Sequence, residues 1–174
     1  MKIARYVIFL QLIACLSACS QERIMIRNHE KTFDKVFESC IDKTDTNMVE
    51  IIDTSKIVIL ESDLQYLGNV TGYDQSNLQI IAVHQTYGLP RCPHGKGRIY
   101  IVKDKKVIGW YDGFVCGFKA YLNNGMLMVQ AYKDSPFTKI DFSTGIPSSI
   151  FLPEDSCGNG DEYPFFKKKN KKSL

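Results

Sequence analysis

The residue types that carry out catalysis form no recognisable constellation in this 174-residue chain. A hydrolase needs a nucleophile beside a base or two opposed carboxylates, and the sequence contains no Gly-x-Ser-x-Gly, HExxH or phosphate-binding glycine motif. Its three histidines are His29, His84 and His94. Neither His84 nor Cys92-Pro93-His94 belongs to the CxxC or HxxxH pairs that are typical of zinc sites. We therefore predict a protein that is not an enzyme and that holds no metal or cofactor.

An acidic loop near the C-terminus is a second candidate for chemistry. Asp155-Ser156-Cys157-Gly158-Asn159-Gly160-Asp161 partly matches a calcium loop, but its third position is Cys157 and its twelfth is Phe166, where a glutamate is required. The alternative to a calcium site is a loop that presents carboxylates to a partner, with four acidic side chains within nine residues: Glu154, Asp155, Asp161 and Glu162. Such a loop could occupy a basic or catalytic cleft.

The first 18 residues have the organisation of a secretory signal peptide. Lys2 and Arg5 precede an apolar run, Tyr6–Leu16, that is too short to span a membrane comfortably, since a spanning helix needs roughly 20 residues. Small residues follow at Ser17 and Ala18. From this pattern alone, an ordinary secreted protein cleaved at a nearby small residue is one possible reading.

The end of this segment, Leu16-Ser17-Ala18-Cys19, resembles the lipobox of bacterial lipoproteins. The resemblance implies that Cys19 becomes the mature N-terminus and carries lipid chains, which together anchor a protein stably in a bilayer. In such lipoproteins an aspartate after the cysteine favours the inner membrane, whereas Ser20 follows here. The implied location is the outer membrane, lipid-anchored and facing the periplasm.

Four cysteines remain once Cys15 and Cys19 are assigned to this N-terminal segment, and an even number in an oxidising compartment predicts two disulfides. Arg98–Lys103 and Val107–Asp112 form a predicted hairpin around Asp104-Lys105-Lys106, and two cysteines lie twelve residues on either side of Asp104. We therefore predict a Cys92–Cys116 bridge, which leaves Cys40 to pair with Cys157.

The predicted fold class is α+β, with one N-terminal amphipathic helix packed on an antiparallel β meander. Apolar residues follow helical spacing in one segment: Phe33, Val36, Phe37, Cys40 and Ile41. Beyond it, β-branched and aromatic runs separated by turn residues predict these strands: 56–60, 64–67, 78–87, 98–103, 107–112, 118–122, 126–132, 138–142 and 149–152. Asn123-Asn124-Gly125 is the strongest hairpin signal among the turns.

These patterns divide the chain into four parts: a signal peptide (1–18), a polar tether (19–28), a single domain (29–166) and a lysine-rich disordered tail (167–174). From Cys19 to Phe166 the net charge is −4, with 15 basic and 19 acidic residues. This balance excludes a nucleic-acid-binding body, which needs a basic face for phosphate contacts. The tail could instead contact anionic lipid headgroups.

The aromatic residues around Gly113 are candidates for a partner-binding surface together with the acidic loop. Trp110, Tyr111 and Phe114 are the types favoured at interface hot spots, although small β domains also place them in the core.

In size, anchor and cysteine content the chain resembles the lipoprotein immunity proteins that guard against type VI secretion effectors. The resemblance implies a protein partner, a secreted phospholipase or cell-wall hydrolase, that this chain binds and neutralises. The alternatives are a structural or assembly lipoprotein of an envelope machine, and a phage or plasmid exclusion lipoprotein.

Overall fold

The computed structural model describes residues 24–27, 37, 41, 49–53, 59–89, 92–115 and 117–168 of the chain. Within these ranges lie eleven β-strands: β1 Ile24–Arg27, β2 Val49–Asp53, β3 Ile59–Thr71, β4 Asn77–Leu89, β5 Cys92–Lys103, β6 Lys106–Val115, β7 Lys119–Asn123, β8 Met126–Gln130, β9 Thr138–Ile140, β10 Ser149–Pro153 and β11 Gly160–Lys167.

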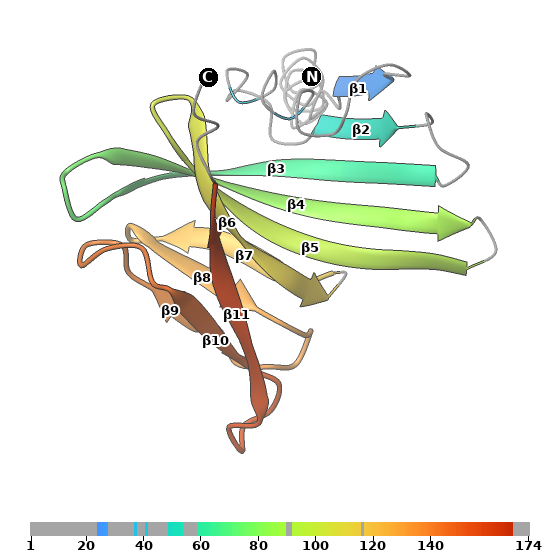
Figure 1. Ribbon diagram of the computed structural model, residues 1–174. Helices are drawn as coiled ribbons and strands as arrows, with labels where there is room; N and C mark the ends of the chain where they lie inside the picture. The colour runs from blue at the N-terminus through green and yellow to red at the C-terminus, as the bar shows by residue number, and fades with distance from the viewer. Residues whose placement is uncertain are drawn as a thin grey trace, which may run out of the picture.

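The strands form two sheets. The larger sheet has the order β1-β2-β3-β4-β5-β6-β11-β10, and the smaller has the order β7-β8-β9. The β1–β2 pair is parallel, and the other pairs are antiparallel. Figure 1 shows the long strands β3 to β6 as a twisted layer, with β7 to β10 packed beneath it and β11 descending across them.

The central strands are apolar at consecutive positions because both of their faces are covered. In β4, Ile80 faces one side and Ile81 the other, and both are buried. In β5 the same holds for Ile99 and Tyr100, and the register places Ile81 opposite Tyr100. A strand that is covered on both faces has a continuous run of apolar residues, whereas apolar and polar residues alternate in a strand that is covered on one face.

The main core lies between the long strands β3 to β6 of the large sheet and the layer formed by β7 to β10. Its buried residues are Val70, Leu78, Ile80, Ala82, Ile99, Ile101, Tyr111, Phe114, Phe118, Leu127, Val129, Ala131, Ile140, Phe142, Ile150, Leu152 and Tyr163. Burying this many aliphatic and aromatic side chains supplies the largest stabilising contribution to the fold, because each contributes about 1.5–3 kcal/mol of transfer free energy.

The predicted α+β class is wrong for the described part of the chain, which is nearly all β: its elements are all strands, and Phe37 is the one described residue with a helical backbone. Most of the segment predicted as an amphipathic helix lies outside the described residues. Two of its residues are described, Phe37 and Ile41, and both are buried in a second core on the opposite face of the large sheet. There Phe37 packs on Tyr100, with ring centroids 4.5 Å apart. The apolar spacing thus identified Phe37 and Ile41 correctly as core residues, and the predicted helix itself stays a prediction.

The predicted hairpins are confirmed, with turns of two residues. Asp104 and Lys105 have φ angles of 49° and 62° and connect β5 to β6, while Asn124 and Gly125 have φ angles of 50° and 75° and connect β7 to β8. Positive φ at both central residues is the geometry that matches the twist of a β-hairpin. The sequence analysis did not predict β1, β2 and β11.

One of the two predicted disulfides is also corrected. Cys157 is an exposed free thiol, so it is not bonded to Cys40, which lies outside the described residues, as does Cys116. Two register shifts in the β5–β6 ladder place Val115 opposite Lys96. Because Cys116 lies outside the described residues, the Cys92–Cys116 bridge stays a prediction.

Two predicted boundaries also shift. β1 lies inside the segment predicted as a tether, and β11 ends at Lys167, the first residue of the predicted disordered tail. The backbone N–H of Lys168 donates to the carbonyl of Ile108 over 3.0 Å, which continues the β6–β11 pairing by one residue.

Candidate functional site

The outer face of the small sheet carries exposed aromatic side chains. In β7, Ala120 and Leu122 pack against the main core, so Tyr121 between them points to the opposite side. Tyr121 meets Phe137 edge-on, with ring centroids 5.3 Å apart and an interplanar angle of 75°. Edge-to-face pairs of this kind are favourable, and here both rings remain partly exposed.

Strand β10 extends this face by the same alternation. Ile150 and Leu152 are buried, and Phe151 between them is 48% exposed. The hydroxyl of Thr138 donates to the carbonyl of Phe151 over 2.9 Å, which joins the start of β9 to β10. Phe137 immediately precedes Thr138, so the exposed rings of Phe137 and Phe151 are carried by neighbouring segments.

Carboxylates border the aromatic side chains at the β10–β11 end. Phe151 lies directly opposite Glu162 in the register. The hydroxyl of Tyr132 donates to Oε1 of Glu154 over 3.3 Å. Partial desolvation, together with the charges of Glu154 and Asp161, raises the pKa of Tyr132, so its phenol remains a neutral hydrogen-bond donor at physiological pH.

The loop between β10 and β11 is held by one of its own acidic residues. Oδ1 of Asp155 accepts the N–H groups of Cys157 (2.8 Å) and Asn159 (3.2 Å), and its Oδ2 accepts the Asn159 side-chain amide (2.8 Å). The bond from the Asn159 side chain is the main cause of a lowered pKa at Asp155. Asp155 therefore shapes the loop, while Glu154, Asp161 and Glu162 are exposed, and the carboxylate of Glu162 accepts the hydroxyl of Ser149.

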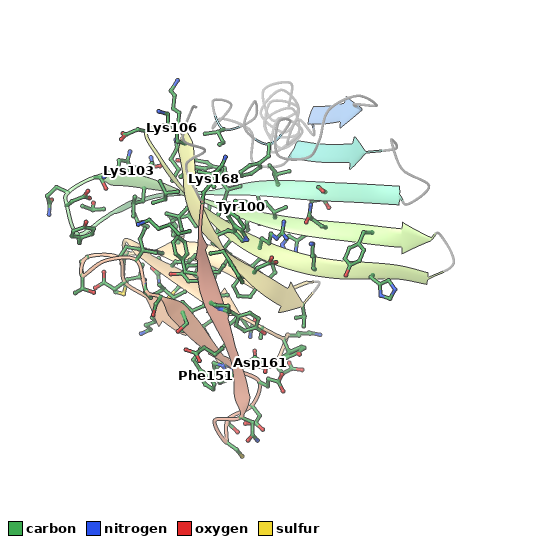
Figure 2. The ribbon with its side chains drawn as sticks, in the orientation of Figure 1. Tyr100, Lys103, Lys106, Phe151, Asp161 and Lys168 are labelled. Carbon is green, nitrogen blue, oxygen red and sulfur yellow. The ribbon has the colours of Figure 1, made fainter. Side chains whose placement is uncertain are left out.

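We name this region the acidic–aromatic surface and define it by Tyr121, Met126, Tyr132, Phe137, Phe151, Glu154, Asp161 and Glu162, all of them exposed. Figure 2 labels Phe151 and Asp161 at the lower end of the molecule, and Lys103, Lys106 and Lys168 at the other end. Aromatic side chains surrounded by polar groups are typical of protein-binding surfaces. This surface suits a partner with a basic and partly apolar face.

The three aromatic residues predicted for partner binding lie elsewhere. Tyr111 and Phe114 are 0% and 1% exposed, so they are core residues and offer no surface. Tyr111 donates its hydroxyl to the carbonyl of Pro147 over 2.8 Å, and burial raises its pKa. Trp110 is half-buried, stacked on Phe166 with centroids 6.1 Å apart. Of the predicted binding residues, the structure brings together those of the acidic loop only.

Sequence analysis missed Tyr121, Tyr132, Phe137 and Phe151. For two of them a signal was present: Phe151 alternates with Ile150 and Leu152, and Tyr121 alternates with Ala120 and Leu122. In a strand with one face covered, the residue between two buried neighbours points outward. Tyr132 and Phe137 lie outside the strands, where no periodicity applies.

The other residues with possible chemistry are structural in the described part. His84 lies against Phe118, with ring centroids 4.5 Å apart, and burial lowers its pKa while the charge of Asp63 opposes this effect. No group of three or more His, Cys, Asp or Glu side chains within the described ranges is placed to hold a metal ion. Cys19 lies outside the described residues.

No helix among the described residues combines the length and the hydropathy that crossing a bilayer requires.

Comparison with known proteins found no matching family model, no matching curated protein and no matching solved structure.

Proposed function

We propose that this protein is a lipid-anchored lipoprotein of the outer membrane that faces the periplasm and neutralises a toxic enzyme by binding it through the acidic–aromatic surface. The proposed enzyme is a type VI secretion effector, either a phospholipase or a cell-wall hydrolase. In this proposal the chain does no chemistry on a substrate and acts as an inhibitor.

The observation that supports this proposal best is the composition of the acidic–aromatic surface. Phe151 and Tyr132 supply exposed aromatic area, and Glu154, Asp161 and Glu162 border them with negative charge. An enzyme that acts on an anionic substrate such as a phospholipid binds it with basic groups. The carboxylates of the β10–β11 loop and of the start of β11 can occupy such a cleft. The aromatic side chains beside them can supply the buried contacts of a hot spot.

The position of this surface also fits an anchored inhibitor. Cys19 precedes the start of β1 at Ile24 by five residues, and a chain of that length spans at most about 18 Å. A lipid on Cys19 therefore keeps β1 close to the bilayer. In Figure 1, β1 lies at the top of the molecule and the β10–β11 loop at the bottom, so the acidic end of the acidic–aromatic surface lies away from β1.

The test is affinity capture with the full chain carrying a C-terminal tag, from periplasm and from the culture fluid of competing bacteria. We expect a stoichiometric complex with one enzyme whose activity falls on binding. Phe151→Ala should weaken that complex about tenfold or more, as hot-spot truncations do. Tyr73→Ala is the matched control, because Tyr73 is an exposed aromatic residue in the β3–β4 turn and does not belong to the acidic–aromatic surface.

Three outcomes contradict the proposal. Recovery of envelope components without an enzyme favours the assembly reading, and a bound enzyme that stays fully active is not an inhibited target. Equal loss of affinity in Phe151→Ala and Tyr73→Ala places the contact somewhere other than the acidic–aromatic surface.

The anchor is tested separately with Cys19→Ala. We expect this change to remove the lipid, which lowers the mass of the mature protein and releases it from the membrane fraction. An unchanged mass and membrane fraction would show that the lipoprotein part of the proposal is wrong.

A further inference from the structure

A pocket opens beside the β3–β4 turn, at one end of the main core. Its volume is about 490 Å³, within the range of small-molecule sites, which are commonly about 300–1,000 Å³. The pocket is formed by the β3–β4 turn, the adjoining ends of β4, β5, β6 and β11, and the loop before β10. Its lining residues are Gly72, Tyr73, Asp74, Ser76, Leu78, Lys103, Ile108, Ile146, Ser148, Phe165 and Lys167.

The floor of the pocket is apolar because it is the open end of the main core. Leu78 is a buried member of that core, and Ile108, Ile146 and Phe165 pack against it. Phe165 is fixed in place by Tyr111, with ring centroids 5.1 Å apart. The floor therefore stays in contact with solvent unless an apolar ligand covers it, and covering it gains about 25 cal/mol for each Å² removed from water.

One wall of the pocket is built by the β3–β4 turn. The N–H of Gly72 donates to the carbonyl of Ser76 over 2.8 Å, and Oδ1 of Asp74 accepts the N–H of Ser76 over 3.1 Å. These bonds close the turn and leave Tyr73 at its tip, 66% exposed. The wall is thus a tied turn that carries an aromatic ring at the pocket mouth.

The two cations that line the pocket differ in their partners. Lys103 lies 2.5 Å from Oδ2 of Asp74, and this hydrogen bond raises the pKa of the lysine while the carboxylate compensates its charge. The ion pairs between described residues are Lys103–Asp74 and Arg98–Asp112, so Lys167 has none within the described part of the chain. Lys106 and Lys168 lie at the same end of the molecule (Figure 2). The pocket therefore combines an apolar floor with one uncompensated positive charge.

We propose that this pocket binds an amphiphile that carries a single anionic group on an aliphatic chain. The chain covers Leu78, Ile108, Ile146 and Phe165, and the anionic group lies against Lys167. Ser148 also lines the pocket, and a serine hydroxyl can donate a further hydrogen bond. A carboxylate from a fatty acid and a phosphate from a lipid share this chemistry, and the test below separates them.

The proposal is tested by calorimetric titration of the full chain carrying Cys19→Ser, which leaves no thiol for a lipid. The probes are dodecanoate and dodecyl phosphate below their micelle concentrations, with dodecanol as the neutral analogue and butyrate as the short-chain analogue. We expect one site, tighter binding of an anionic dodecyl probe than of dodecanol, little binding of butyrate, and the negative heat-capacity change that accompanies apolar burial. Preference for dodecanoate indicates a fatty acid, and preference for dodecyl phosphate indicates a lipid phosphate.

Two variants locate the site and one controls for general charge. Ile146→Trp fills the pocket and should weaken binding at least tenfold. Lys167→Gln changes an exposed side chain and should weaken binding of the anionic probe about fivefold, the loss of one partly exposed ion pair. Lys106→Gln removes the same charge outside the pocket lining and should change affinity less than twofold. Urea unfolding of each variant verifies that it is folded.

The proposal is overturned if neither anionic probe binds, if dodecanol binds as tightly as dodecanoate, or if folded Ile146→Trp retains full affinity. It is also overturned if Lys106→Gln and Lys167→Gln weaken binding equally, since the effect would then come from the overall field of the lysines.

Discussion

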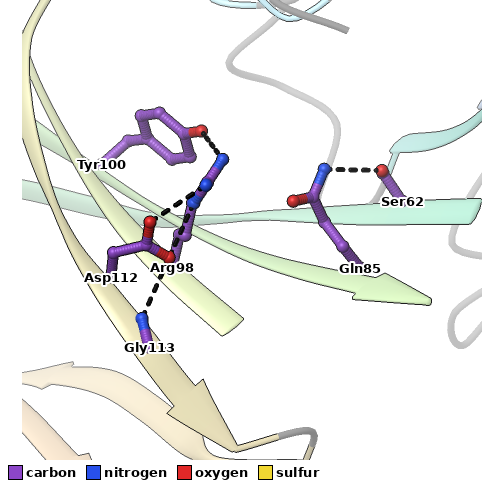
Figure 3. A network of polar contacts seen from close by, with 6 residues as sticks. All are labelled: Ser62, Gln85, Arg98, Tyr100, Asp112 and Gly113. Carbon is purple, nitrogen blue, oxygen red and sulfur yellow. Dashed lines mark hydrogen bonds and ion pairs between the residues drawn. The ribbon is translucent and has the colours of Figure 1, made fainter. Parts of the chain in front are cut away.

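Arg98 on β5 and Asp112 on β6 form a two-bond ion pair across the large sheet. Nε of Arg98 lies 2.8 Å from Oδ1 of Asp112, and Nη2 lies 2.9 Å from Oδ2 (Figure 3). Oδ1 also accepts the N–H of Gly113 over 2.9 Å, and Arg98 donates to the hydroxyl of Tyr100 over 3.3 Å. The register shift in the β5–β6 ladder lies directly beside this pair. The ion pair therefore fixes the alignment of the two strands at an irregular point.

Replacement of Asp112 by Asn should destabilise the protein. The two side chains are only 20% and 26% exposed, so the change leaves the guanidinium of Arg98 partly buried and poorly compensated. We expect the free energy of unfolding to fall by about 1–3 kcal/mol, the usual contribution of hydrogen bonds to charged groups. Urea unfolding measures this loss. Asp74→Asn, which disrupts the exposed Lys103–Asp74 pair, should cost less, and equal losses would show that the Arg98–Asp112 pair has no special role.

Stability should fall when the pH is lowered through the range where His84 protonates in the unfolded chain. Burial lowers the pKa of His84 below its ordinary value of 6.5, although the charge of Asp63, its cross-strand neighbour, opposes this effect. The unfolded state therefore binds a proton first, and the contribution of His84 is complete above pH 6.5 and declines below it. Urea unfolding at several pH values between 7.5 and about 5 should show this decline. The slope should be shallower in His84→Gln, and an identical slope would contradict the assignment.

Gly109 should not tolerate a side chain. A Cβ atom there would lie 2.2 Å from the ring of Phe165 and 2.6 Å from the carbonyl oxygen of Phe166, and the backbone oxygen cannot rotate away. Gly109 of β6 pairs with Lys167 of β11 in the antiparallel ladder. Gly109→Ala should therefore displace β11 and lower the free energy of unfolding by about 1–3 kcal/mol, as overpacking does.

The displacement of β11 can be followed by thermal unfolding together with hydrogen exchange of the Lys168 N–H, which bonds to Ile108. Gly125→Asn is the matched control, because its turn position is open and asparagine adopts positive φ readily. If Gly109→Ala is as mild as this control, the close packing of β11 on β6 is not required.

The thiol of Cys157 should react readily with iodoacetamide in the native protein, because it is exposed and not bonded in a disulfide. Mass spectrometry of a digest should find the label on Cys157 without prior reduction, and Cys157→Ser should remove that signal without loss of stability. Labelling of Cys157 only after reduction would restore the disulfide that the sequence predicted.

The sequence determined much of the local structure, because the signals for it are local. The apolar runs of β4 and β5 and the turn at Asn124-Gly125 depend on neighbouring residues, and they were predicted correctly. By contrast β11 was missed. It is short of aliphatic residues and contains Pro164, and it pairs with β10 up to that proline and with β6 after it. Proline donates no hydrogen bond, so a strand that changes partners beside it has no recognisable pattern in the sequence.

The acidic loop could be recognised from its residue types, since carboxylates clustered among turn residues are almost always exposed. The choice between Tyr111 and Phe151 as a surface residue could not be made in this way. Both are aromatic residues in strands, and their exposure depends on whether another layer covers the face to which each one points. Only the tertiary structure decides this, because the layers that bury Tyr111 and leave Phe151 exposed come from distant parts of the chain.

The pairing of cysteines is governed by the same physical limit. Counting twelve residues on either side of a turn assumes a regular ladder, and the β5–β6 ladder contains two register shifts. A β-bulge is a response to packing: Gly97 adjoins the shift beside Arg98, and a Cβ atom on that glycine would lie 2.3 Å from the ring of Phe118. The sequence by itself therefore determined the strands and turns, whereas their registers, their covered faces and the pocket at the end of the core required the assembled layers.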